Sequence, residues 1–429
     1  MDHRVYREIL ENGMDMLLIP FEKAVTMTVA VGIFVKVGSR YETSERNGMS
    51  HFLEHMMFKG TKKYPKNKIS ELLDGVGAIY NAETSYESTN YYIYGHKNDL
   101  DLFIDIMCDI YMNPLFREDD IIIERGVVVE ELNMYRDDPQ DIIQDMLHKT
   151  MCGNSGLGMN IIGTKENILS FNGRDLEDFR EEFYVPHRTV FVVSGNFSKE
   201  RVGENIRKQL GTVRASLSQV ECPIYHTERQ KKPQINVREQ NSMAQTNIII
   251  AFRSGSKDSK YVDVYEIIAG LLSSGSSSRL YDLLRNKLGA TYFNHAQNHA
   301  FEKEGIFTIH MGVDNKRVDE VLGRVLQEIH GLRRAEIITK KELDKVKRIK
   351  ITAFSLALQT PVDFMSYYGM QELNYYVGCD KLDERPIDIA SRIKNFESIT
   401  IEDVYVAMRE LFCRKNLNII IYGTPPVKI

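Results

Sequence analysis

Two histidines, His51 and His55, are four residues apart in the segment 51–58. On an α-helix this spacing places both side chains on one face, one turn above the other. Two imidazoles held in this way can bind one small cation together, and zinc is the usual candidate. Glu54 lies three residues after His51, so its carboxylate borders the same face without having to be a ligand. The segment therefore predicts a metal-binding helix, although two ordinary histidines on a solvated helix would show the same spacing.

A catalytic zinc site also needs a third protein ligand and an open position for water. The best candidate is Glu131, in the stretch 119–135, where apolar residues at mixed helical spacing predict a mostly buried helix. Glu124 lies seven residues earlier, which is two helical turns away on the same face. Acids on the inward face of an apolar helix are costly unless a cation meets them. We interpret Glu131 as a ligand and Glu124 as its hydrogen-bonded support; taken alone, a solvated glutamate-rich helix would be the simpler interpretation.

Residues 51–61 read His-Phe-Leu-Glu-His-Met-Met-Phe-Lys-Gly-Thr, and His-x-x-Glu-His is the order typical of the inverzincins. Together with Glu124 and Glu131, this segment resembles the pitrilysin family of zinc peptidases. The similarity is greatest to the short-subunit branch, which includes the mitochondrial processing peptidase and its bacterial relatives. The 76 positions from His55 to Glu131 match the spacing of that family. The likeness extends over nearly the whole chain, through residues 77–84, 89–92, 156–158, 162–164, 193–195, 278–280 and 285–292.

The resemblance implies a zinc metalloendopeptidase that holds one zinc ion per chain through His51, His55 and Glu131. Glu54 would take a proton from the attacking water and later deliver it to the leaving amine, as a general base and acid does. Glu124 would orient one of the ligands through a hydrogen bond. The expected substrates are peptides or unfolded, presequence-like segments.

Four further residues acquire a role only through the resemblance. In the family, the strand that matches Asn81 and Ala82 lies at a sheet edge, where a substrate peptide adds to it by backbone hydrogen bonds. The arginine and tyrosine that match Arg285 and Tyr292 bind substrate carbonyl groups near the zinc, and both side chains can donate to a developing oxyanion. Taken alone, Asn81 is a turn or edge residue, and the other two are a surface arginine and a strand tyrosine.

The resemblance also bears on assembly. In the family, the two halves of one subunit pair with the two halves of a second subunit around a closed chamber. This chain carries both the zinc-binding helix and the Arg285–Tyr292 pair, so a homodimer would be self-sufficient. Two alternatives stay open, namely a catalytic subunit that needs a related partner chain and a non-catalytic scaffold or peptide-binding relative. The scaffold fits less well, because such relatives have lost the zinc residues, whereas all of them are present here.

The composition is that of a soluble globular protein, with 43% hydrophobic and 27% charged residues. A net charge of −5 provides neither a basic surface for nucleic acid nor a polybasic membrane patch. The five cysteines include no Cys-x-x-Cys pair, which favours a reducing compartment over a disulfide framework. No signal or transit peptide is evident, and the apolar run 24–35 is too short to span a membrane. We therefore expect a cytoplasmic protein or a mature organellar form.

The second half of the chain repeats the first. Residues 174–195 align without gaps to 402–423, and residues 28–39 align to 245–256. Continuing the second alignment places Ile268 and Leu272 where the two histidines would be, so the second copy lacks the metal site. At 429 residues, two domains are expected. We predict an α+β fold of two homologous domains, each a mainly antiparallel sheet with helices packed on one face. The catalytic domain would cover 1–215, a linker 216–232, and the metal-free domain 233–429.

Overall fold

The computed structural model describes residues 3–21, 26–214, 230–240, 242–333, 337–375 and 388–426. The chain divides into two compact units. The first contains the described residues of Met1–Asn133, Met159–Pro223 and Ala357–Pro386, and the second contains those of Met134–Gly158, Ile224–Leu356 and Ile387–Ile429. The units differ from two continuous domains because each sequence half contributes one segment to the other unit. The predicted boundaries at 215 and 233 stay a prediction, since most of the linker lies outside the described residues.

The sheet of the first unit has β3 (Thr28–Val35) near its centre and is antiparallel except where β2 pairs with β6. All positions of β3 after Thr28 are buried, which indicates that both faces of the sheet are covered. The spatial order of the six strands is β1 (Tyr6–Ile9), β2 (Asp15–Pro20), β6 (Thr189–Gly195), β3, β5 (Thr89–His96) and β4 (Ile79–Thr84).

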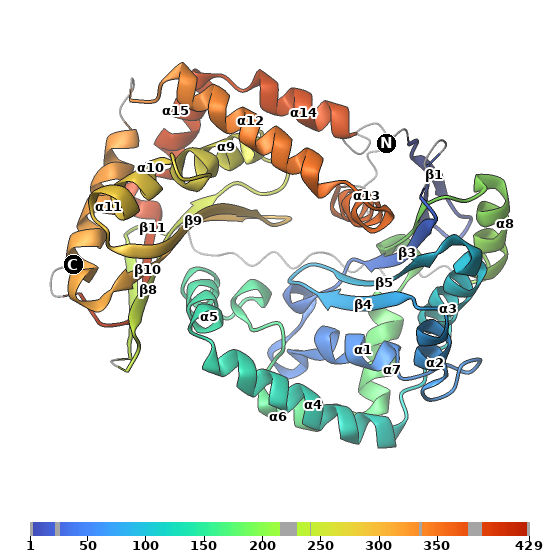
Figure 1. Cartoon of the computed structure of the whole chain (residues 1–429). Helices are drawn as coiled ribbons and strands as arrows, with labels where there is room; N and C mark the ends of the chain where they lie inside the picture. Colours follow the sequence, from blue (N-terminus) through green and yellow to red (C-terminus); the bar gives the residue numbers. More distant parts are fainter. Residues whose placement is uncertain are drawn as a thin grey trace. The chain divides into compact units, whose positions relative to one another are not determined.

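Helices from the same half of the sequence pack on one face of this sheet (Figure 1). Alternate residues of β3, such as Val31 and Ile33, are fully or almost fully buried in one core with Phe52 and Phe103 from the helices, as the period of a strand requires. The helices of this unit are α1 (Met49–Met57), α2 (Lys68–Gly75), α3 (Leu100–Met112), α4 (Glu118–Asp137), α6 (Lys165–Ser170), α7 (Gly173–Phe183) and α8 (Lys199–Leu210).

The opposite face of the first sheet is covered by α13 (Pro361–Tyr375), which comes from the second half of the sequence (Figure 1). Two glycines let this helix approach closely. A Cβ on Gly32 would lie 2.7 Å from Met365 Sδ, and a Cβ on Gly369 would lie 2.5 Å from the ring of Phe34. Both distances are too short for real atoms; the Met365 side chain could shift away from Gly32, whereas a Cβ at Gly369 would require the Phe34 ring to move.

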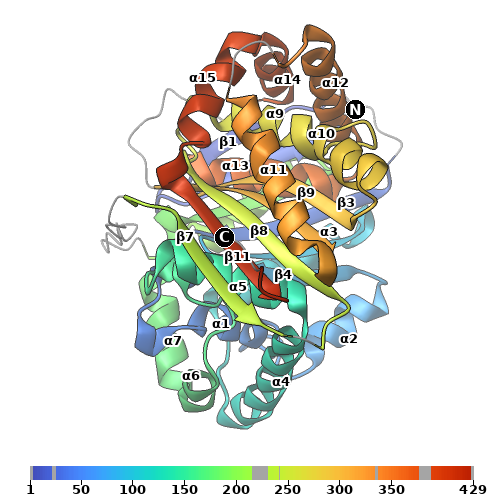
Figure 2. The same cartoon turned by 90° about the vertical axis from the view of Figure 1, so that its left-hand side faces the viewer.

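The second unit has a sheet of the same kind, which Figure 2 shows with β7, β11 and β8 side by side. Its spatial order is β7 (Gln234–Glu239), β11 (Leu417–Gly423), β8 (Gln245–Ser254), β10 (Gly305–Asp314) and β9 (Thr291–Ala300), with β7 parallel to β11. Its helices are α9 (Val262–Ser273), α10 (Arg279–Tyr281), α11 (Val318–Leu332), α12 (Lys340–Ala357), α14 (Ile389–Ser398) and α15 (Ile401–Leu411).

The first half of the sequence returns a helix to this second sheet. Helix α5 (Pro139–Cys152) contacts β7, β8 and β11. Asn236 of β7 donates a hydrogen bond to Thr150 Oγ1 at 2.8 Å, and Arg253 of β8 donates to the carbonyl of Met151. Each sheet is therefore covered by helices of its own sequence half and by one helix from the other half.

Strand pairing follows the alignment of the two sequence halves. Val35 of β3 pairs with Thr189 of β6, and the aligned positions, Phe252 and Leu417, pair in the second sheet. The aligned helices α7 and α15 both begin with a capping box, made by Asn172 with Asp175 and by Thr400 with Asp403. The predicted α+β fold with two homologous domains is confirmed. Among the described residues, no helix has both the length and the apolar character needed to cross a membrane.

Helix α13 brings a buried carboxylate to the first sheet. Glu372 is fully buried, and its Oε1 lies 2.5 Å from Arg7 Nε. The same guanidinium lies 3.0 Å from Asp15 Oδ1, so two buried acids share one arginine. Burial and the charge of Asp15 raise the pKa of Glu372 to about 7 against the opposing effect of Arg7. A folded-state pKa above the ordinary value of 4.5 means that the fold favours the protonated acid.

The raised pKa of Glu372 predicts that the free energy of unfolding falls as the pH rises. The contribution of protonated Glu372 is fully present below pH 4.5 and is lost as the pH rises through about 7. At 1.36 kcal/mol per pKa unit, the loss is at most about 3 kcal/mol. Glu372→Gln cannot ionise, so its denaturation midpoint relative to wild type should rise between pH 5 and pH 9. Glu320→Gln, the same change at an exposed glutamate paired with Arg317, should show a constant difference. A constant difference for Glu372→Gln as well would contradict the assignment.

Candidate metal centre

The start of helix α1 is fixed by a buried carboxylate from the preceding loop. Glu42 Oε2 accepts a hydrogen bond from the backbone N–H of Gly48 at 2.8 Å, and its Oε1 accepts one from Ser50 at 2.7 Å. The N–H groups in the first turn of a helix have no partner within the helix, and the positive end of the helix dipole favours an anion there. Glu42 therefore anchors the helix that carries His51 and His55.

Helices α1 and α4 bring three predicted ligands together. One donor atom from each of His51, His55 and Glu131 lies within 4.8 Å of the other two. His51 Nε2 is 3.7 Å from Glu131 Oε1, and His55 Nε2 is 3.3 Å from Glu131 Oε2. Two imidazole nitrogens and one carboxylate oxygen are a donor set that fits zinc, and three protein ligands leave one position open. In the part of the chain that the structure describes, this is the only such group.

Glu124 supports one of these histidines from the side away from the ligand cluster. Its Oε1 lies 2.8 Å from His55 Nδ1, and its carboxylate is buried. A proton on Nδ1 donated to this carboxylate leaves Nε2 free to face Glu131. Glu124 Oε2 is 2.5 Å from the ammonium of Lys59, a residue that the sequence did not suggest. Burial acts to raise the pKa of Glu124, but the bonds to His55 and Lys59 outweigh it and lower that pKa.

The electrostatics of the cluster favour a cation. Hydrogen bonds from His51 and His55 lower the pKa of Glu131 to about 2. Burial acts to lower the pKa of His55, but its bonds to Glu124 and Glu131 and the charge of Glu54 prevail and raise that pKa to about 9. Three carboxylates thus stabilise positive charge at one point, and a divalent cation would interact with the same groups.

Glu54 lies beside the cluster and is held by a residue that the sequence did not suggest. The hydroxyl of Thr84, at the end of β4, donates a hydrogen bond to Glu54 Oε2 at 2.6 Å. Burial raises the pKa of Glu54, which the bond from Thr84 and the charges of His51 and His55 oppose. A partly buried carboxylate with one fixed oxygen is suited to a positioned general base.

Strand β4, which carries Asn81 and Ala82, is the last strand of the first sheet and contacts helix α1. It pairs on one side with β5, where Asn81 lies opposite Tyr92 and Ala82 opposite Tyr91. The other side of an edge strand presents backbone N–H and C=O groups that an added strand can use. The expected edge position is therefore observed, next to the helix that holds both histidines.

Arg285 and Tyr292 belong to the second unit and lie beside each other within it. The guanidinium carbon of Arg285 is 5.9 Å from the centre of the Tyr292 ring, and Arg285 donates a hydrogen bond to the carbonyl of Thr291 at 3.4 Å. Tyr292 is 79% exposed, so its hydroxyl is open to a ligand. Arg285 lies on a π-helical turn, η6 (Asp282–Lys287), a conformation that is rare and frequent at functional sites.

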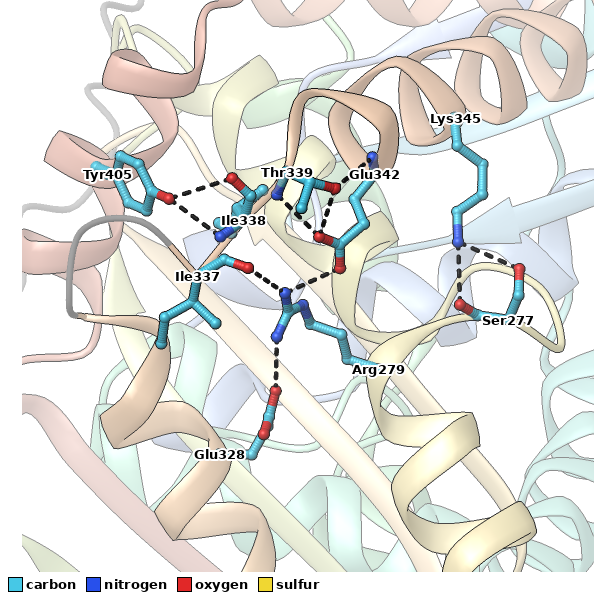
Figure 3. Close-up of polar contacts among 9 residues, drawn as sticks. All are labelled: Ser277, Arg279, Glu328, Ile337, Ile338, Thr339, Glu342, Lys345 and Tyr405. Atoms are coloured by element: carbon cyan, nitrogen blue, oxygen red, sulfur yellow. Dashed lines mark hydrogen bonds and ion pairs between the residues drawn. The ribbon is translucent and has the colours of Figure 1, made fainter.

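The segment that leads into this π-helical turn is held by Arg279 (Figure 3). Its guanidinium contacts Glu328 at 3.1 Å and Glu342 at 2.9 Å, and it donates to the carbonyl of Ile337 at 2.7 Å. Figure 3 also shows Lys345 of α12 bonded to Ser277, whose carbonyl it reaches at 3.0 Å. These contacts fix the start of the segment that presents Arg285.

Comparison with known proteins agrees with this arrangement. The family model described as Insulinase (Peptidase family M16) matches residues 19–165, and the model of the Peptidase M16 inactive domain matches residues 170–350. An uncharacterized zinc protease of Bacillus subtilis, YmxG, is 31% identical over 411 residues, which cover 95% of this chain and 96% of that protein. The chain belongs to peptidase family M16. This family assignment confirms the suspected resemblance to the pitrilysin family of zinc metallopeptidases.

Other proteins are similar over most of this chain. Uncharacterized zinc proteases of Mycobacterium leprae and Streptomyces coelicolor are 28% and 27% identical, each over 90% of this chain and over 85% and 82% of their own lengths. A protease of Helicobacter pylori has the same fold, with a TM-score of 0.89, 21% identity, and coverage of 98% of this chain and 99% of that one. The inactive-domain match agrees with α9, where fully buried Ile268 and Leu272 replace the two histidines.

The contact between Thr84 and Glu54 predicts a kinetic effect in this M16 chain. Thr84→Val keeps the shape of the side chain but removes the donor, so Glu54 loses its fixed orientation. We expect cleavage of an unstructured peptide to slow roughly tenfold in kcat, since small misplacements of a catalytic group carry large costs. Zinc content should stay unchanged, and Thr84→Ser, which keeps the hydroxyl, should cleave at nearly the wild-type rate. Equal rates for the valine and serine variants would refute this role.

Proposed function

We propose that the chain is a zinc-dependent endopeptidase that hydrolyses peptides or unfolded, presequence-like segments inside a chamber formed by a dimer. The observation that carries this proposal is the convergence of His51, His55 and Glu131 within 4.8 Å, with Glu54 beside them. The relatives named zinc proteases and the family assignment support the same chemistry.

The chain would hold one zinc ion through His51, His55 and Glu131. Bound there, zinc supplies a Lewis acid that polarises the scissile carbonyl and makes a water molecule more acidic. Glu54 accepts the proton of the attacking water and delivers it to the leaving amine. The hydrogen bond from Thr84 at 2.6 Å fixes one oxygen of this carboxylate and so positions it for the exchange. Glu124 keeps His55 in the orientation that the site needs.

The substrate would be aligned as an additional strand on the free edge of β4, at Asn81 and Ala82. Backbone pairing binds an extended chain with little regard to its side chains, which fits peptides and unfolded segments better than folded proteins. Arg285 and Tyr292 would donate hydrogen bonds to substrate carbonyl groups and to the oxyanion that develops during attack. Their proximity in the second unit, with Tyr292 exposed, supports this shared role.

Loss of the general base provides the direct test. Glu54→Gln removes the proton acceptor but leaves the three ligands in place. We expect one zinc per chain in wild type and variant, and a fall of at least ~100-fold in the cleavage rate of an unstructured peptide library. Glu71→Gln, the same change at an exposed glutamate of α2, should cleave normally. Near-normal turnover by Glu54→Gln would reject the base, and wild type without zinc or without cleavage would reject the proposed function.

The proposed assembly is a homodimer, because one chain carries both the zinc ligands and the Arg285–Tyr292 pair. Sedimentation velocity of the purified chain should show a dimer, and the dimer fraction should carry the peptidase activity. An inert monomer that gains activity only on mixing with a related chain would support a partner-dependent catalytic subunit instead.

A further inference from the structure

Lys59 follows the end of helix α1, four residues after His55. It contacts Glu124, which in turn contacts His55 of the proposed zinc site. Its ammonium lies 2.5 Å from Glu124 Oε2, while the other oxygen of that carboxylate lies 2.8 Å from His55 Nδ1. The three side chains thus form a row that ends at a proposed ligand. Lys59 is not one of the three residues whose donor atoms converge.

We propose that Lys59 is a positioning residue of the zinc site, which holds the Glu124 carboxylate in the orientation that fixes the His55 imidazole. The inference rests on the proposed zinc function and adds to it a residue that neither the motif nor the ligand geometry includes. Lys59 acts through Glu124 and is not among the residues of the ligand cluster.

The first argument is one of hydrogen-bond balance. Glu124 is almost completely buried, and a carboxylate accepts at both oxygens. His55 can satisfy only Oε1, and a buried Oε2 without a partner would be costly. Oε2 has no hydrogen-bond partner among the described residues, so the ion pair with Lys59 at 2.5 Å is the contact that compensates it. The support matters more because His51 Nδ1 has no hydrogen-bond partner among the described residues, whereas the Nδ1 of His55 is held by Glu124.

The second argument is that the backbone of Lys59 is also fixed to the start of α4. Arg117, which directly precedes that helix, donates a hydrogen bond to the carbonyl of Lys59 at 3.1 Å and pairs with Asp120 at 2.6 Å. The next residue is bound as well, since the backbone N–H of Leu115 donates to the carbonyl of Gly60 at 2.9 Å. The root of the Lys59 side chain is therefore held in place relative to α4, so its ammonium reaches Glu124 from a defined direction.

The third argument is charge. Glu54, Glu124 and Glu131 bring three negative charges to one region, and a divalent cation balances two of them. Lys59 supplies the remaining positive charge, so the zinc-bound site is neutral in sum. Without Lys59, the two described ion pairs of Glu124 would be reduced to the one with His55. The carboxylate would then turn toward solvent or toward the cation, and the imidazole would lose its support.

The test is a double-mutant cycle on the whole chain, with zinc affinity as the measured quantity. Lys59→Met removes the ammonium and keeps the length of the stem. Zinc affinity, measured by competition with a chromophoric chelator, should fall about tenfold, the lower range for partners that orient a ligand. Glu124→Gln should weaken binding by a similar or larger factor, and the double variant should bind no more weakly than Glu124→Gln alone. Such non-additivity is expected only if Lys59 acts through Glu124.

Controls separate positioning from general damage. Lys59→Arg should bind zinc within about threefold of wild type, because a guanidinium also pairs with a carboxylate. Lys62→Met, the same change at an exposed lysine three residues later in the loop, should bind as wild type does. The visible spectrum of the cobalt-substituted protein should change in Lys59→Met and return in Lys59→Arg. If Lys59→Met does not fold, Lys59→Gln, which keeps one donor, takes its place with an expected intermediate affinity.

The outcomes also distinguish this inference from the proposed function. Wild-type affinity in Lys59→Met and Lys59→Gln, or losses that add to that of Glu124→Gln, would overturn the role of Lys59 while leaving a zinc peptidase intact. A wild-type chain that binds no zinc would overturn both. A coupled loss, rescued by arginine, would establish Lys59 as part of the machinery that positions the metal ligands.

Discussion

The pairing of imidazoles on α1 with carboxylates on α4 is the constraint on which the first unit depends. The buried residues of α4 are Ile121, Glu124, Val128 and Leu132, an apolar stripe at helical spacing that one acid interrupts. That acid is tolerated because His55 and Lys59 meet it. A shift of either helix by one turn would leave Glu124 buried among apolar side chains, so the polar contacts fix the register that the apolar contacts alone would leave free. The same register delivers Glu131 to both histidines.

The second unit has apolar residues at the sequence positions that align with the metal-ligand candidates of α1. Ile268 and Leu272 of α9 align with the two histidines when the sequence alignment of the halves is continued, and both are fully buried in the second core. Apolar side chains there stabilise the unit directly, whereas the first unit has buried imidazoles, three carboxylates and an ammonium in the corresponding region. Such groups are stable together only when each has a partner, which explains why Glu42 and Thr84 also direct their polar atoms to this helix. The first unit contains the candidate ligands and their polar partners, and the second unit has apolar side chains at the aligned positions.

The features that the sequence could predict are local or repeated. The spacing of His51 and His55 defines a helical face by itself, and the repeat of 28–39 in 245–256 marks two matching strands, β3 and β8. Glu124 and Glu131 needed the family resemblance, because two acids seven residues apart are common on solvated helices. Lys59 and Thr84 lie in segments that carry the resemblance, but their roles could not be assigned, since each acts on a residue at least 30 positions away and no periodicity links them. The exchange of α5 and α13 was also missed, because an amphipathic helix does not reveal which sheet it covers. The unbroken apolar run of β3 did indicate that helices cover both faces of the sheet, because a strand buried on both faces needs a second layer.

That second layer gives the second half of the chain a structural role beside the half that carries the candidate ligands. The face of the first sheet that carries Gly32 and Phe34 is covered by α13, whose glycine and methionine fit against those two residues. Without α13, this apolar face of the sheet beside the zinc helix would be exposed to water, and the Arg7–Glu372–Asp15 contact would be missing. The second sheet depends in the same way on α5, which begins two residues after α4 ends. Each half therefore completes the core of the other, and the half without ligands contributes to the metal centre by stabilising the sheet on which the zinc helix packs.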